Sequence, residues 1–142
     1  MRMTWLVWSL LSALFAAMTA ILAKKGVAHV EPNLATAIRT SVVLVLAWGI
    51  AIALGRPHEV KDLDGKTWLY LAASGIATGL SWLCYFRALS LGPASKVAPL
   101  DKLSVVLVLL FAWPMLGERL TPGKILGGLL LTAGAVVLTI AR

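Results

Sequence analysis

The sequence predicts an all-α membrane protein, a bundle of five transmembrane helices forming one domain over residues 1–142. Apolar residues make up 60% of the chain and charged residues 13%, with a mean hydropathy of +0.90, whereas soluble domains are about 45 to 50% apolar. The apolar residues form runs close to the ~20 that a helix needs to cross a bilayer. Alternating barrel strands are excluded by this pattern. The expected helices are, approximately, residues 3–23, 33–54, 67–91, 95–116 and 122–141.

The formal net charge of +7 does not indicate a nucleic-acid partner. The thirteen Lys and Arg residues are scattered over the predicted helix ends instead of clustering on one face, so most are expected to contact headgroups and set topology. The single cysteine, Cys84, has no partner for a disulfide or a zinc site. We therefore expect no metal and no cofactor.

The first apolar run extends to Lys24 and Lys25. It is longer than the ~7 to 15 residues usual in a signal peptide, which favours a retained helix. Small residues recur along it three and four positions apart: Ser9, Ser12, Ala16, Thr19 and Ala23. Such a stripe normally packs against other helices, and lining a substrate path is the alternative.

The second helix is expected to begin near Pro32, because a first turn does not need the missing N–H of proline. Arg39 lies about two turns inside it, on the order of 10 Å from the helix start. Either a snorkelling arginine or a functional cation fits that depth. Residues 55–66 carry mixed charges without metal-ligand spacing and predict a solvated loop, with room for one helical turn.

The third helix has the most polar face of the chain, which should look into the bundle. That face comprises Ser74, Thr78, Trp82 and Tyr85. Gly75 and Gly79 form a GxxxG pair, a signal of close helix packing. Arg87 lies near the end of the helix, and Gly92 with Pro93 breaks the chain before the fourth.

The fourth helix contains Pro99, which removes a backbone hydrogen bond and should bend the helix or loosen its first turns. Asp101 and Lys102 follow within the helical pattern. Thr121 and Pro122 predict the N-cap and first turn of the fifth helix. On one face of that helix, three glycines are expected to serve helix contact: Gly123, Gly127 and Gly134.

The charges inside the predicted spans lie at helix ends on one side of the membrane: Arg39, Arg87, Asp101 and Lys102. Each costs roughly 2.5 to 3.5 kcal/mol at mid-membrane, so such residues are functional-site hypotheses by default. In one bundle, Asp101 would find a cation to pair with. An excess of about +2 would remain and favour a carboxylate or phosphate. A structural ion-pair network that fixes helix register is the alternative.

Five spans place the termini on opposite sides of the membrane. Six basic residues lie on the N-terminal side (Arg2, Arg56, Lys61, Lys66, Arg119 and Lys124) and four on the other (Lys24, Lys25, Lys96 and Arg142). The positive-inside rule then makes the N-terminus cytoplasmic. Because six basic residues against four is a small difference, the protein could also insert in both orientations.

Several segments together resemble the EamA transporter domain of the drug/metabolite transporter superfamily. They are TAIRT, CYFRALSLGPAS leading into VAPLDKLS, LGE at residues 116–118, and GKILGGLLLTAGAVVL. The resemblance covers nearly the whole chain and implies a five-helix unit. In the family, two units are usually fused around a central path for small metabolites. We expect a homodimer here, because transporter sites lie between repeats, and an antiparallel pair would reproduce an inverted repeat.

The segment GLLLTAGAV also resembles the dimerising last helix of small multidrug resistance exporters. Those relatives exchange protons for cationic drugs through a glutamate in their first helix. The first helix here contains no acid, which disfavours that route. If protons drive transport, Asp101 is the candidate carrier, because it is the only acid well inside a predicted span.

The predicted function is secondary transport, by export or exchange, of a small polar or anionic metabolite across a bacterial or archaeal inner (plasma) membrane. The expected substrate path comprises Arg39, Ser74, Thr78, Trp82, Tyr85, Arg87, Asp101 and Lys102. A flippase for a lipid-linked substrate and a non-transporting partner subunit are the alternatives. We expect no enzyme and no catalytic residues, because no acid/base pair or nucleophile set occurs at a membrane surface, and His29 and His58 lie in loops on opposite sides.

Overall fold

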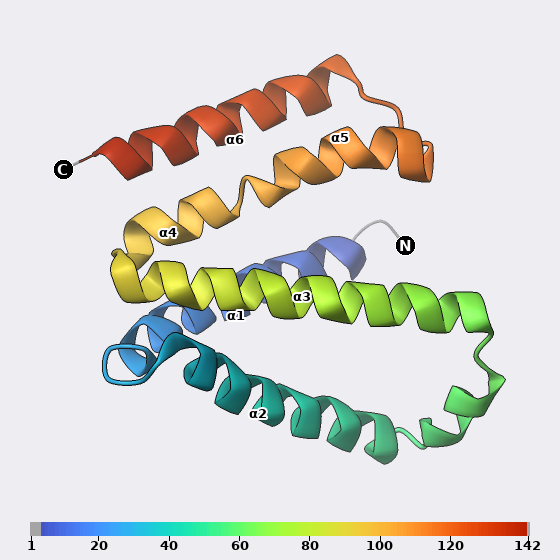
Figure 1. Cartoon of the computed structure of the whole chain (residues 1–142). Coiled ribbons are helices and arrows are strands. Elements are labelled where there is room, and N and C mark those ends of the chain that lie inside the picture. The colour runs from blue at the N-terminus through green and yellow to red at the C-terminus, as the bar shows by residue number, and fades with distance from the viewer. Residues whose placement is uncertain (1–3, 142) are drawn as a thin grey trace. The chain divides into compact units, whose positions relative to one another are not determined.

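The computed structural model describes residues 4–141, which are helical apart from short connections (Figure 1). The elements in order are α1 (Thr4–Gly26), α2 (Pro32–Ala53), the 3-10 helix η1 (Pro57–Asp62), α3 (Gly65–Leu91), α4 (Ala94–Asp101), α5 (Ser104–Leu116) and α6 (Pro122–Ile140). Within the described residues, five helical segments are long and apolar enough to cross a membrane, with α4 and α5 together forming one of them. The predicted all-α fold with five spans is confirmed. Residues 1–3 and Arg142, which include two charges of the side count, lie outside the described part.

Side-chain caps fix where three of the helices begin. Glu31 precedes Pro32 and accepts a hydrogen bond from Leu34 N at 2.8 Å, so α2 begins one residue before the predicted start. Asp64 Oδ1 accepts from Thr67 N at 3.1 Å at the start of α3. Thr121 Oγ1 accepts from Lys124 N at 3.4 Å, which confirms the predicted cap of α6. Each bond satisfies a backbone donor that the first turn leaves free.

The fourth predicted span is two helices, not one. Pro99 has no N–H, and beyond it Lys102 N donates to Pro99 O at 3.1 Å and Leu103 N donates to Leu100 O at 3.0 Å. These bonds to the third preceding residue tighten the backbone, so α4 ends at Asp101 and α5 starts at Ser104. The loosening expected from Pro99 is present, but it falls after the proline and not in the first turns. Pro114, by contrast, lies within α5 without splitting it.

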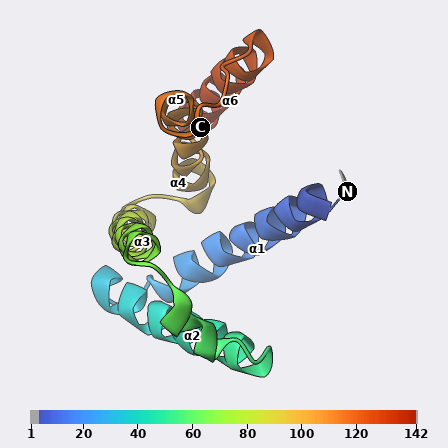
Figure 2. The same ribbon diagram turned by 90° about the vertical axis from the view of Figure 1, so that its right-hand side faces the viewer.

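The helices form two compact units. The first unit comprises Met1–Lys24 and Leu91–Arg142, and the second comprises Lys25–Ser90. In the first unit, α6 runs back alongside α4 and α5 (Figure 2). Gly128 of α6 is buried, and a Cβ there would lie 3.5 Å from Leu109 Cδ1 of α5. Lys24 Nζ donates to Gly92 O at 2.8 Å and so ties the last turns of α1 to the link that precedes α4.

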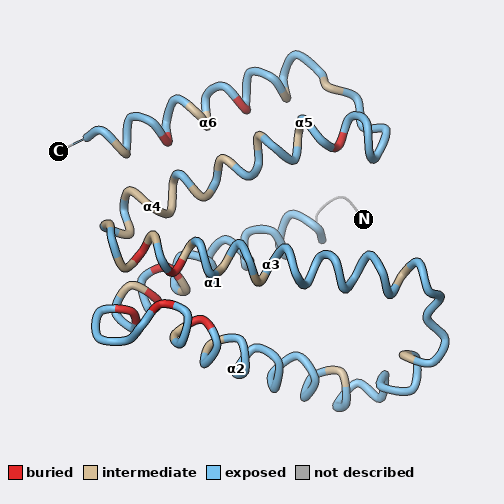
Figure 3. Tube along the Cα trace, viewed as in Figure 1, coloured by how far each residue is buried: buried red, intermediate tan, exposed pale blue. Residues whose placement is uncertain are grey.

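The second unit is an antiparallel pair, α2 and α3, joined through η1. Its buried residues gather where α2 begins and α3 ends (Figure 3): Val27, Pro32, Thr36, Phe86 and Leu89. Toward η1 the two helices diverge (Figure 1), and most of their apolar side chains are exposed. Exposed apolar surface of this extent is what a lipid-facing or partner-facing helix requires.

Candidate functional site

Arg39 of α2 lies against aromatic rings of α3. Its Cζ is 3.7 Å from the centroid of the Trp82 ring and 5.6 Å from that of Phe86. Both distances fall within the ~6 Å range of cation–π attraction, which contributes about 2 kcal/mol when the cation is desolvated. The aromatic faces therefore stabilise a charge that lies about two turns inside a span.

Helical periodicity explains why these side chains meet. On α2, Thr36 and Arg39 are three residues apart and share a face, and Thr36 is buried. On α3, Trp82 and Phe86 are four residues apart, and Phe86 is only 3% exposed. The two faces converge at the buried end of the second unit.

The guanidinium of Arg39 is not satisfied by the protein. Its Nη1 is buried without a hydrogen-bond partner among the described residues. The neighbouring hydroxyls bond to their own helix, since Thr36 Oγ1 donates to Pro32 O at 2.9 Å and Thr40 Oγ1 donates to Thr36 O at 2.8 Å. Buried donors without partners are rare and need an explanation.

Three of the four carboxylates of the second unit are engaged elsewhere. Glu31 caps α2 and Asp64 caps α3, while Glu59 forms an ion pair with Arg56. No ion pair joins Arg39 to an acid within residues 4–141. The charge of Arg39 is therefore not neutralised by an ion pair within the described residues.

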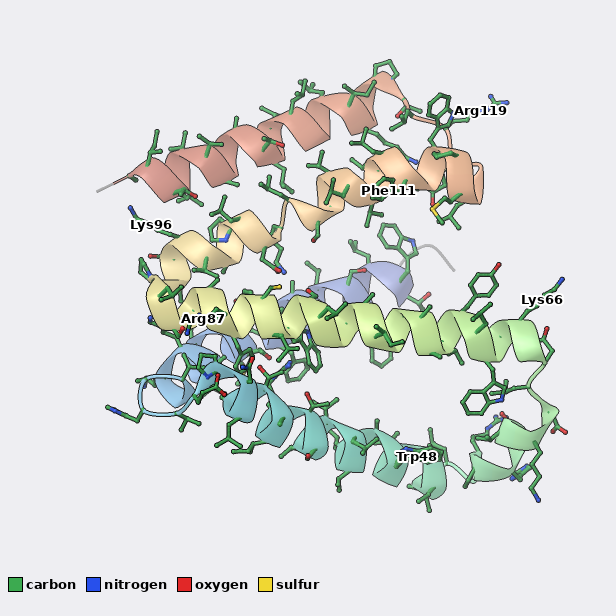
Figure 4. The ribbon with its side chains drawn as sticks, viewed as in Figure 1. Trp48, Lys66, Arg87, Lys96, Phe111 and Arg119 are labelled. Atoms are coloured by element: carbon green, nitrogen blue, oxygen red, sulfur yellow. The ribbon has the colours of Figure 1, made fainter. Side chains whose placement is uncertain are left out.

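The other predicted residues of α3 have different surroundings. Tyr85 is half-buried and interacts electrostatically with Arg39. Ser74 and Thr78 are exposed, and the Thr78 hydroxyl donates to Ser74 O at 2.9 Å. Arg87 is exposed near the end of α3, opposite Lys66 at its start (Figure 4). The structure thus brings Arg39, Trp82 and Tyr85 together, whereas a role for Ser74, Thr78 and Arg87 in the path stays a prediction.

Asp101 and Lys102 pair with each other. Lys102 Nζ lies 3.3 Å from Asp101 Oδ2, and the side chains are 56% (Lys102) and 35% (Asp101) exposed. The sequence analysis expected Asp101 to pair with a cation but did not name Lys102 as that cation. The pair lies at the end of α4, where Asp101 is the last helical residue and Lys102 is the C-cap. Whether these charges meet Arg39 and Arg87 stays a prediction.

Glycines predicted to mediate packing are open within this chain. A Cβ added at any of five positions would meet nothing within 4 Å among the described residues: Gly75, Gly79, Gly123, Gly127 and Gly134. Their packing role stays a prediction that concerns contacts outside the chain. Gly128, which the sequence analysis did not single out, makes the contact with α5. The sequence analysis assigned helix contact to the face of Gly123, Gly127 and Gly134, whereas the contact with α5 is made by the adjacent Gly128.

A pocket of about 270 Å³ lies apart from these residues, between the second half of α2 and η1. It is lined by Leu44, Ala47, Trp48, Ala51, Arg56, Pro57 and Val60. Trp48 lies in the part of α2 that approaches η1 (Figure 4). The pocket contains none of the predicted path residues, and its one charged side chain is already paired with Glu59.

Two contributors were missed by sequence reasoning. Phe86 provides the second ring beside Arg39, and its spacing of four residues from Trp82 was the available signal. Lys24 was placed in a loop, but it belongs to α1 and bonds to Gly92 O. Within the described chain, no three His, Cys, Asp or Glu side chains lie close enough together to hold a metal ion.

Five apolar spans, a broken helix and a cation held inside one span define a helical membrane transporter. The EamA-like transporter family matches residues 3–140. The chain therefore belongs to the EamA-like transporter family, which confirms the resemblance found in the sequence.

Two curated relatives are similar to this chain. A Sinorhizobium sp. protein named "Uncharacterized transporter in cobO 3'region" is 50% identical over 140 residues, covering 99% of both chains. The aromatic amino acid exporter YddG of Ancylobacter novellus is 33% identical over 124 residues, which are 87% of this chain and 42% of the exporter. No solved structure matches the chain.

Proposed function

We propose that this protein is a secondary transporter that exports or exchanges a small polar or anionic metabolite across the inner membrane. The observation that carries the proposal is the buried Arg39 Nη1, which has no hydrogen-bond partner among the described residues while the guanidinium lies on Trp82. A desolvated cation attracts an anionic group more strongly than one in water. The site therefore favours a substrate with a negatively charged group.

The charges of the first unit support the same substrate class. Asp101 and Lys102 neutralise each other as an ion pair, so they add no net charge to their span. Arg39 is not paired in the second unit. The spans thus carry an uncompensated positive charge, which disfavours a cationic drug as the substrate.

We propose a homodimer as the working form. The chain covers 99% of its Sinorhizobium relative but only 42% of the aromatic amino acid exporter. Two copies would together approach the length of the longer protein, with the substrate path between them. The open glycine faces of α3 and α6 are proposed as the surfaces that pack in the dimer.

Asp101 is proposed as the proton carrier. It is partly exposed at the break between α4 and α5, where a change in its protonation would alter the pairing with Lys102. The N-terminus is proposed to be cytoplasmic, from the distribution of basic residues. Access of labels to cysteines introduced near each terminus, from either side of the membrane, tests this orientation.

The similarity to an exporter of aromatic amino acids makes these the first substrates to test. Purified protein is reconstituted into liposomes, and counterflow of labelled phenylalanine, tryptophan, other amino acids, carboxylates, phosphates and cationic drugs is measured. Saturable counterflow of an anionic or zwitterionic compound supports the proposal. Transport of cations alone contradicts it.

Two further outcomes identify the alternatives. Movement of a fluorescent phospholipid across the membrane without counterflow of any metabolite indicates a flippase. Folded dimers that transport nothing across the whole panel indicate a partner subunit.

A further inference from the structure

Resting on the proposed transport function, we infer that the substrate is recognised through a carboxylate bound along the Nε–Nη2 edge of the Arg39 guanidinium, with Trp82 as the residue that fixes the orientation of this group. The contact joins one guanidinium to one carboxylate. A phosphate dianion, or the amide of the same substrate, is expected to bind the Arg39 guanidinium less well than the carboxylate does.

The stacking distance sets the orientation. Arg39 Cζ lies 3.7 Å from the centroid of the Trp82 ring, the separation of two stacked groups in van der Waals contact. In a stacked guanidinium the N–H bonds lie parallel to the indole plane and point sideways. The ring therefore stabilises the charge without using any of the five donors.

The burial of Nη1 bears on which edge of the Arg39 guanidinium binds the ligand. Nη1 is covered by protein and has no partner, yet Arg39 as a whole is half-exposed. We place the ligand on the donors that the covered Nη1 leaves, Nε and Nη2, which form one edge of the guanidinium. Two parallel N–H donors on this edge match the two oxygens of a carboxylate, and such bidentate pairs are about twice as strong as neutral hydrogen bonds.

Charge balance selects a monoanion. Arg39 has no counterion among the described acids, so a single carboxylate neutralises it. Phosphate carries a charge of about −1.5 to −2 near pH 7, and one guanidinium would leave part of that charge desolvated. Trp82 is consequently a positioning residue, because its ring face is occupied by Arg39 and its contribution is to keep the donor edge in place.

The test compares ligands that differ only in the carboxyl group. Reconstituted protein is assayed for counterflow of labelled phenylalanine, or of whichever carboxylate the panel identifies, in competition with the acid, its amide and inorganic phosphate. We expect the acid to compete at least about 30-fold better than the amide, since the amide retains one acceptor oxygen and no charge. We expect phosphate to compete weakly or not at all.

Variants separate geometry from charge. Arg39→Lys keeps the charge but loses the planar fork, so KM for the acid should rise about tenfold or more while the KM for the amide changes little. Trp82→Leu should raise KM for the acid with little change in maximal rate, and Trp82→Phe should restore most of the affinity because a ring face is again present. Thermal unfolding in detergent verifies that each variant is folded.

Equal competition by acid and amide overturns the inference while leaving the transport function intact. The same holds if Arg39→Lys behaves as wild type, or if acid and amide weaken in parallel, which would indicate a structural role for Arg39. If phosphate competes better than the carboxylate, the group that binds Arg39 is a phosphate and the inference is wrong. Absence of any transport by folded wild-type dimers removes the proposed function itself and, with it, this inference.

Discussion

The two units of this protein hold charge inside their spans in different ways. In the second unit, Arg39 lies on the Trp82 ring, and its Nη1 has no hydrogen-bond partner among the described residues. In the first unit, Asp101 and Lys102 neutralise each other where the helix is interrupted. An aromatic face stabilises a cation without occupying its hydrogen-bond donors, whereas an ion pair neutralises the charges of both partners.

That difference separates two tasks of a transporter. A cation with free donors and a fixed plane is suited to binding an anion. A self-neutralised pair at a helix break is suited to changing state, because protonation of the acid releases the base. We therefore expect substitutions in the second unit to change substrate affinity and those at the break to change coupling.

The largest expected effect comes from removing the cation. Arg39→Gln should reduce uptake of the anionic substrate by at least about 100-fold, because two charge-assisted hydrogen bonds of roughly 1.5 to 3 kcal/mol each are lost. The melting temperature should change little, because the lost attraction to the Trp82 ring is opposed by the removal of a buried donor without a partner. Lys66→Gln, an exposed cation at the start of α3, is the matched control and should transport normally. A fall in both activity and melting temperature for Arg39→Gln would make Arg39 a structural residue.

The second prediction concerns coupling at the helix break. With a gradient of one pH unit, a transporter that carries one proton accumulates substrate about tenfold. Asp101→Asn should abolish this accumulation, while counterflow without a gradient persists. Lys102→Ala should also abolish gradient-driven transport with expression and detergent stability near wild type.

Uptake measured in liposomes with and without the pH gradient checks the prediction. If both variants fail to assemble, the pair fixes helix structure instead. If Asp101→Asn still accumulates substrate, another group carries the proton or transport is not coupled to protons.

The third prediction compares adjacent glycines of α6. Replacing glycine by alanine in a helix contributes about 0.5 to 1 kcal/mol of stability. Gly128→Ala should show this gain, because its Cβ would make an ordinary contact with Leu109 Cδ1 at 3.5 Å. Gly127→Ala meets open space within the described chain, so it should instead weaken the dimer if that face packs against a second copy.

Unfolding in detergent and light scattering after size-exclusion chromatography measure the two effects. Identical behaviour of Gly127→Ala and Gly128→Ala in both measurements would show that Gly127 is not at a subunit interface.

Much of the fold follows from local pattern. The spans, the Thr121 cap and the proline start of α2 depend on residues close together in sequence, and the structure has all of them. Pro99 indicated a weakened helix but not its position, because the tightened bonds form at Lys102 and Leu103, after the proline. Pro99 thus indicated that the helix is interrupted but did not give the position of the interruption between α4 and α5.

The candidate site was less predictable, because it depends on how two helices are rotated. Arg39 and Trp82 were both assigned to the substrate path, but periodicity did not show that they touch. Phe86 was missed for the same reason. The choice between Gly127 and Gly128 likewise requires the rotation of α6 against α5, and the Asp101–Lys102 contact requires the helix end.

The smallest expected effect tests how firmly α3, which holds Trp82, is anchored. The hydrogen bond from Thr67 to the Asp64 carboxylate lowers the pKa of Asp64 below its ordinary value. A lowered folded-state pKa means that the cap contributes stability above the unfolded pKa of about 3.9 and loses it as pH falls through the folded value. The wild-type melting temperature should therefore fall more steeply below about pH 4 than that of Asp64→Asn, whose neutral cap does not titrate. Matching pH profiles would show that the start of α3 does not limit unfolding, and that the stack of Arg39 on Trp82 is maintained independently of this cap.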